Sequence, residues 1–411
     1  MGIVSALVIY TAGAVDDWTL LRWTDGEGNP LLLEPPDTDT TVVAPPAPFG
    51  VAYPVPLEGV GCVYLWAGSF AARTASILLE RELANRYIKS AGAMIKQYGR
   101  RGAPMADAEM RLQTAQQYFS SEQWQQSLAA GVQAAEQSVV SVARARLQRM
   151  HGRTAFLWGA CADDPEVAQQ VIQQLNPPLN LIQIPIDGRL DAWQCISRQA
   201  QGARMAVAAV FDPHHDDALA TDALRDALMN FRGQARYWSV AMRLHQLVSG
   251  KSTLAPIRER CELARAVDFG IVRLLHSAHS LYRQQHAYSV LNACVQHEIP
   301  FEVVHLEWYW YDGTLYDLDL LLERYGELGK PIHLTLGLPP SAGYERFSRA
   351  EPLEWVEGAA LIALSKPYVA ALRIPSQASN PSAGACKSSG APSEHWERIT
   401  QVVAWSRAML E

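Results

Sequence analysis

The residues best placed for chemistry are acidic and lie where predicted strands end. Glu307 closes the predicted strand Phe301–Glu307, and Asp312 follows a few residues later. Asp212 comes directly after another predicted strand. Two carboxyl groups such as those of Glu307 and Asp212 can supply an acid and a base to one reaction. The first hypothesis is therefore acid–base chemistry at the ends of these strands.

Asp212 also begins the stretch Asp212–Asp217, which contains His214 and His215. These side chains are of the types that bind metal ions. Adjacent histidines seldom converge on one ion, however, and the chain has neither an HExxH motif nor facial-triad spacing. The favoured interpretation is a solvated loop that caps the next helix. We predict no metal site and no cofactor.

Four consecutive aromatic residues, Trp308 to Tyr311, separate Glu307 from Asp312. They cannot all face one core, because successive side chains point in different directions. Aromatic faces beside carboxylates suit sugar stacking and equally suit an interface; we favour an interface or packing within the chain. His305 either points into a barrel mouth or is a core histidine. The candidate ligand-binding residues are thus His305, Glu307, Trp308, Trp310, Asp312, Asp212 and His214.

From residue 151 onwards, strand-like and helical patterns alternate over about 260 residues. The predicted strands are Thr154–Trp158, Asn180–Ile186, Arg204–Phe211, Tyr237–Met242, Gly270–Leu275, Phe301–Glu307, Pro331–Thr335 and Tyr368–Ile374. The helices are Pro165–Leu175, Leu190–Gln201, Thr221–Phe231, Thr253–Val267, Tyr282–His297, Leu315–Leu328 and Leu353–Leu364. This rhythm predicts an α/β fold, a (β/α)8 TIM barrel over 151–411. A doubly wound sheet is the alternative, but its usual Gly-rich phosphate turn is missing.

Two further regions precede the barrel. Residues 1–79 carry short strand-like runs between Gly- and Pro-rich turns, which predicts a small β-sandwich-like domain. Residues 80–150 change to helical spacing and are expected to form a helical hairpin or connector.

Composition restricts partners and location. The net charge of −7 comes without a basic stripe, which argues against a nucleic-acid partner. No run reaches the roughly 18 apolar residues of a membrane-spanning helix. The apolar run Ile3–Tyr10 has no basic residue before it, so it is interpreted as a first strand and not a signal peptide. The six cysteines are scattered singly, without a CxxC pair, as in a reduced cytoplasmic protein.

Several segments resemble glycoside hydrolase family 10, the endo-β-1,4-xylanases. Leu321–Thr335, LLERYGELGKPIHLT, is similar to the family's helix and strand seven. The segment from Glu354 to Val369, with ALSKPYV, is similar to its helix and entry to strand eight. Tyr237–Arg243 takes the place of its strand-four motif. The N-terminal part, with Leu79–Arg86, more loosely resembles bacterial family-10-like proteins that have a β-rich segment and helices before the barrel.

The resemblance implies a retaining glycosidase, which needs two carboxyl groups about 5–5.5 Å apart. By the same resemblance, Arg243 stands at the acid/base position and Leu336 at the nucleophile position. A leucine cannot attack an anomeric carbon, and an arginine stays protonated. We therefore favour a non-catalytic, glycosidase-like barrel that acts as a structural, assembly or glycan-binding protein. The alternative is an active hydrolase of xylan or a related β-glycan that uses relocated carboxylates. The expected partner is a second copy of the chain or a polysaccharide.

Overall fold

The computed structural model describes residues 6–11, 18–26, 31, 41–43, 48–71, 74, 76–150, 156–174, 179–187, 189–211, 217–242, 244, 251–277, 287–337, 347–375 and 394–408. Its dominant feature is a closed barrel of eight strands in which every neighbouring pair is parallel. The strands are β7 (Leu157–Cys161), β8 (Leu181–Pro185), β9 (Ala206–Val210), β10 (Tyr237–Ala241), β11 (Val272–Ser277), β12 (Val303–Tyr309), β13 (Ile332–Gly337) and β15 (Val369–Pro375). The predicted (β/α)8 barrel is confirmed.

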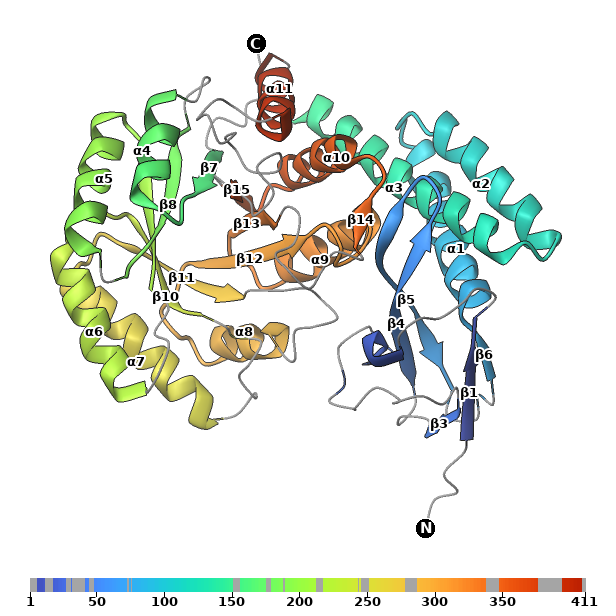
Figure 1. Ribbon diagram of the computed structural model, residues 1–411, viewed down its shortest axis with the longest axis horizontal. Helices are drawn as coiled ribbons and strands as arrows, with labels where there is room; N and C mark the ends of the chain where they lie inside the picture. The colour runs from blue at the N-terminus through green and yellow to red at the C-terminus, as the bar shows by residue number, and fades with distance from the viewer. Residues whose placement is uncertain are drawn as a thin grey trace.

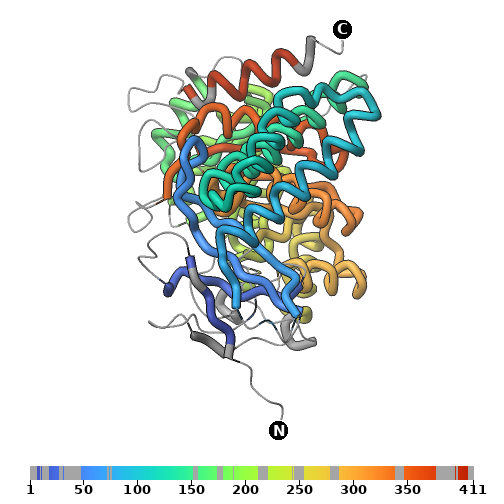
Figure 2. Tube along the Cα trace, turned by 90° about the vertical axis from the view of Figure 1, so that its right-hand side faces the viewer, coloured from blue at the N-terminus to red at the C-terminus, as the bar shows by residue number. Residues whose placement is uncertain are grey.

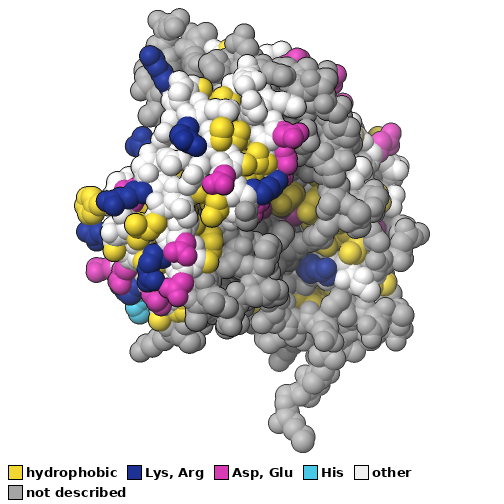
Figure 3. All heavy atoms as spheres, turned by 60° about the vertical axis from the view of Figure 1, so that its left-hand side comes forward, with side chains coloured by type: hydrophobic (Ala, Val, Ile, Leu, Met, Phe, Trp, Pro, Cys, Tyr) yellow, Lys and Arg dark blue, Asp and Glu magenta, His cyan; other side chains and the backbone are white. Residues whose placement is uncertain are grey.

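Helices follow the strands and cover the outside of the barrel (Figure 1). They are α4 (Pro165–Gln174), α5 (Leu190–Gly202), α6 (Asp217–Asn230), α7 (Lys251–Val267), α8 (Ala287–Gln296), α9 (Leu315–Gly326), α10 (Pro352–Ser365) and α11 (Glu394–Ala408). On the face that carries the outer helices at the left of Figure 1, acidic and basic side chains are interspersed (Figure 3). None of the described helices is long and apolar enough to span a membrane.

The N-terminal part is β-rich, as expected. One sheet has the order β3 (Thr41–Val43), β1 (Ala6–Tyr10), β6 (Ser76–Leu78). The other contains β2 (Arg22–Asp25), β4 (Phe49–Leu57), β5 (Gly61–Phe70) and β14 (Ser348–Arg349), and the short 3-10 helix η1 (Trp18–Leu20) precedes β2. The last strand comes from the connection between β13 and α10, so the barrel half supplies an edge strand to the N-terminal sheet.

Three long helices join the two regions: α1 (Leu79–Gly99), α2 (Ala106–Ser120) and α3 (Trp124–Arg149). Figures 1 and 2 show them beside the barrel and next to the N-terminal strands. The apolar face of α3, with Val139, Val140 and Ala143, belongs to the same core as the barrel helices. Leu128 and Val132, nearer its start, pack into the N-terminal core. The division into 1–79, 80–150 and 151–411 stays a prediction, because shared cores join these parts.

Candidate functional site

Strand alternation decides which side chains of β12 enter the barrel. His305, Glu307 and Tyr309 pair in register with His333, Thr335 and Gly337 of β13. Successive residues of a strand face opposite sides, so Trp308 and Leu336 face away from these residues. Both are fully buried in the large core cluster.

The inward-facing residues build a polar group that we call the mouth cluster: His276, His305, Glu307, His333, Thr335 and Arg373. The ring of His276 stacks on that of His305 at 4.0 Å between centroids. His305 Nε2 lies 2.8 Å from Thr335 Oγ1. Glu307 Oε1 lies 3.0 Å from His276 Nε2, and Glu307 also accepts a hydrogen bond of 3.2 Å from Tyr309.

Arg373 is fully buried in this cluster. Its guanidinium donates to Gln183 and to His333 Nδ1, and it lies 3.5 Å from His305 Nε2. Among the described residues, no carboxylate forms an ion pair with it. Burial lowers the pKa of Arg373 to about 10, so the side chain stays charged at neutral pH. A Cβ atom at position 159 would lie 3.1 Å from Cγ of Arg373, so Gly159 leaves room for the arginine side chain.

The two innermost histidines are neutral. Burial is the main cause that lowers the pKa of His305 well below its ordinary value, and electrostatic interactions with His276 and Arg373 lower it further. Burial and Arg373 lower the pKa of His333 in the same way. A neutral imidazole has one acceptor nitrogen, which suits the hydrogen bond from Arg373 to His333.

The side chain of Cys161 also reaches this region, with its sulfur 3.9 Å from Thr335 Oγ1. Burial raises the pKa of Cys161 to about 12. The side chain is therefore a thiol at neutral pH and a poor nucleophile.

Asp163 is the second carboxylate close to Glu307. Loss of solvation raises the pKa of Asp163, the charge of Glu307 raises it further, and Arg189 opposes both. A raised carboxyl pKa beside an ionised carboxylate is the pattern of an acid and a base in one site. Asp163 lies two residues after the end of β7, and its position just after a strand was the signal in the sequence that could have identified it.

The predicted ligand-binding residues separate into four groups. His305 and Glu307 lie in the mouth cluster. Trp308 and Trp310 are 0% and 7% exposed, so neither indole offers a free face. Asp312 accepts a hydrogen bond of 2.9 Å from the backbone N–H of Tyr309 and closes a turn. Asp212, His214 and Arg243 lie outside the described residues.

The aromatic stretch instead joins the barrel to the N-terminal sheet. Tyr311 packs on Phe347 at 5.0 Å, and Phe347 stacks on Tyr64 of β5 at 5.7 Å. The backbone N–H of Tyr64 donates to the carbonyl of Tyr311 at 2.9 Å. We favoured an interface or packing within the chain for this stretch, and these contacts are packing within the chain.

Four polar residues of the barrel interior escaped the sequence reasoning: His276, His333, Arg373 and Gln183. Each occupies an inward position in a barrel strand. A polar residue within a predicted barrel strand, or directly after it, was the available signal.

Comparison with solved structures finds xylanases. The GH10 xylanase of Thermobacillus composti shares 12% identity at a TM-score of 0.49, over 60% of this chain and 97% of that chain. Xylanase XynB of Paenibacillus barcinonensis shares 11% identity at 0.49, over 60% and 95%. A thermostable xylanase mutant from Cellvibrio japonicus shares 10% at 0.48, over 61% and 98%. No family model matches the chain, and no curated protein matches it. Similarity at this level says nothing about activity.

Proposed function

We propose that the chain is a non-catalytic, glycosidase-like barrel with a structural or assembly role. The observation that supports this is the composition of two strands. By the sequence resemblance, the catalytic carboxylates belong at the ends of β10 and β13. These strands read Tyr-Trp-Ser-Val-Ala and Ile-His-Leu-Thr-Leu-Gly, without an acidic residue. Leu336, at the nucleophile position, faces the outer core.

The contacts of the Glu307 carboxylate also support the proposal. Its carboxylate is held by His276 and Tyr309 inside the barrel. An anion with these partners is already satisfied, and it stabilises the positive charge that Arg373 places nearby. The chief role of Glu307 is then to balance charge in the interior.

The aromatic contacts favour a structural role over glycan binding. Stacking on a sugar needs an exposed ring face, and the indoles of Trp308 and Trp310 are buried. The partner we propose is a second copy of this chain. Sedimentation analysis of the purified protein is expected to give a defined oligomer. A monomer that binds xylan oligosaccharides would contradict the structural role and indicate a glycan-binding protein.

The catalytic half of the proposal is tested by measuring release of reducing sugar from xylan and other β-glycans. Wild type, Glu307→Gln and the surface control Glu259→Gln are all expected to be inactive. Release by wild type and the control, but not by Glu307→Gln, would overturn it.

A second candidate function is a hydrolase in which Asp163 is the acid and Glu307 the base or nucleophile. The raised pKa of Asp163 favours it, because a proton donor must keep its proton at the working pH. Its test is the same assay with Asp163→Asn. Activity that both Asp163→Asn and Glu307→Gln abolish supports this candidate, and an inactive wild type removes it.

A further inference from the structure

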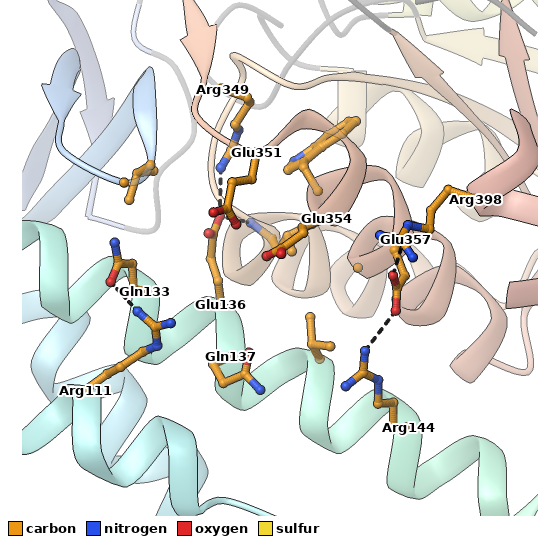
Figure 4. Close-up of a pocket in the computed structure, with 16 residues that line it drawn as sticks. Arg111, Gln133, Glu136, Gln137, Arg144, Arg349, Glu351, Glu354, Glu357 and Arg398 are labelled. Carbon is orange, nitrogen blue, oxygen red and sulfur yellow. Dashed lines mark hydrogen bonds and ion pairs between the residues drawn. The ribbon is translucent and has the colours of Figure 1, made fainter. Parts of the chain in front are cut away.

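The structure contains a polar pocket whose lining includes none of the residues of the mouth cluster. It lies between α3, α10 and the β4–β5 turn, has a volume of about 420 Å³ and is lined by side chains that Figure 4 shows. We call it the α3–α10 pocket. Its volume falls in the range of pockets that hold small molecules.

Two of the four carboxylates that line the pocket already have a cation. Glu136 of α3 pairs with Arg349 at 3.0 Å and also accepts a hydrogen bond of 2.9 Å from the backbone N–H of Leu315. Glu357 of α10 lies between two arginines, Arg144 at 2.9 Å and Arg398 at 3.4 Å. These pairs fix the walls of the pocket, and each of the two carboxylates has at least one arginine partner.

Glu351 and Glu354 differ, because neither forms an ion pair with a described residue. Their carboxyl groups are hydrogen-bonded to each other, and this bond is the first cause that raises the pKa of Glu354. Loss of solvation and the charges of Glu351 and Glu357 raise it further, while Arg398 lowers it. Both residues lie at the N-terminal end of α10, where the helix dipole stabilises negative charge. Glu351 and Glu354 therefore place negative charge without a described ion-pair partner at this end of the pocket.

Two donors of the same pocket have no carboxylate partner among the described residues. The indole N–H of Trp355, a residue only 3% exposed, has no hydrogen-bond partner among the described residues. Arg111 donates to the neutral side chain of Gln133 and pairs with no described carboxylate. A buried donor without an acceptor is costly and rare, so Trp355 independently indicates a missing group that carries an acceptor.

We propose that the α3–α10 pocket binds a small organic cation that carries a guanidinium or amine at one end and a carboxylate at the other. The cationic end pairs with the carboxylates of Glu351 and Glu354. The carboxylate accepts from Arg111 and from the indole of Trp355. Free arginine has both groups and a size that the pocket accommodates. The inference does not rest on the function proposed for the barrel.

Isothermal titration calorimetry with three probes tests the proposal on the unmodified protein. Arginine is expected to bind. Citrulline, which has nearly the same shape but no charge on its side chain, is expected to bind at least about tenfold more weakly. Agmatine, which lacks the carboxylate, is expected to bind several-fold more weakly. Absence of arginine binding, or equal affinity for arginine and citrulline, would overturn the proposal.

Variants locate the binding. The double variant Glu351→Gln and Glu354→Gln changes two exposed side chains and is expected to lose the preference for arginine over citrulline. Arg111→Gln is expected to lower arginine affinity to that of agmatine, whose own affinity is unchanged. Glu259→Gln, on the outer helix α7, is the control. Unchanged arginine binding in the double variant would show that the pocket is not the site.

Proton release gives an independent readout. The cation binds the form in which Glu354 is ionised, so affinity is expected to rise with pH, and binding releases a proton at mildly acidic pH. The observed heat then depends on the ionisation enthalpy of the buffer in wild type, and this dependence disappears in the double variant. A buffer-independent heat in wild type would contradict the role of Glu354.

Discussion

The substitution Asp317→Asn tests how the connector holds the barrel. Asp317 belongs to α9 and is 2% exposed, and its side chain accepts four hydrogen bonds. Arg86 and Tyr87 of α1 each donate at 2.8 Å, and the backbone and hydroxyl of Thr314 donate at 3.0 and 2.6 Å. Arg86 also lies 4.7 Å from the ring of Trp66. One carboxylate therefore caps α9 and joins it to α1.

The expected loss follows from the buried charge. Removing one partner of a buried ion pair costs about 3–5 kcal/mol, because the other charge is left uncompensated. The side chain of Arg86 is 13% exposed, and the amide oxygen of Asn can still accept a hydrogen bond from Thr314. We therefore place the loss of stability at the lower end of this range. We expect Asp317→Asn to lower the free energy of unfolding by about 3 kcal/mol. Arg86→Met is expected to cost about as much for the same reason.

A double-mutant cycle measured by urea unfolding separates the pair from its surroundings. The double variant of Arg86 and Asp317 is expected to lose much less free energy of unfolding than the two single variants lose together. The difference gives a coupling energy of about 2–3 kcal/mol. The exposed pair Arg225–Asp222, with side chains 51% and 73% exposed, is the control, and Asp222→Asn is expected to change stability by less than about 1 kcal/mol. Additivity of Arg86→Met and Asp317→Asn within about 0.5 kcal/mol would refute the reasoning.

Three further predictions concern the barrel. Trp308→Ala removes a fully buried indole and is expected to cost about 3–5 kcal/mol in urea unfolding; a loss below about 1 kcal/mol would contradict its core position. The lowered pKa values of His305 and His333 mean that the unfolded chain takes up protons first, so stability is expected to fall as pH drops below about 6.5, and a constant urea midpoint there would argue against it. Cys195 is exposed whereas Cys161 is buried with a pKa near 12, so a thiol reagent at mildly alkaline pH is expected to label Cys195 first; peptide mapping that finds Cys161 labelled as fast would contradict this.

The fold could be predicted from the sequence because its periodicity is strong. The helix expected at Leu315–Leu328 is observed over Leu315–Gly326, followed by a turn in which Gly329 has a φ of +65°. Only a residue without a side chain adopts that angle at little cost, which is why glycine marked the end of the helix. Local patterns of this kind depend on neighbours in sequence.

The candidate site could be predicted only in part, because it depends on register. The predicted strand ended at Glu307, but β12 continues to Tyr309. This places Glu307 inside the barrel and turns Trp308 outward by alternation. Arg373 was not predicted because its partners, Gln183 and His333, belong to other strands. The register of these strands cannot be derived from the sequence. Contacts between residues far apart in sequence follow from closure of the barrel.

The pairing of β14 with β5 has a consequence for how the protein is made. The backbone N–H of Cys62 donates to the hydroxyl of Ser348 at 3.2 Å, although the two residues are 286 positions apart in the sequence. The backbone N–H of Ala350 donates to the carbonyl of Val60 at 3.1 Å. Ribosomes add about 5–20 residues per second, so the edge of β5 emerges about 15–60 s before its partner strand exists. An open strand edge is a template for pairing with other chains. During synthesis, the nascent N-terminal sheet therefore needs its edge kept from neighbouring chains until the second half of the barrel has been translated.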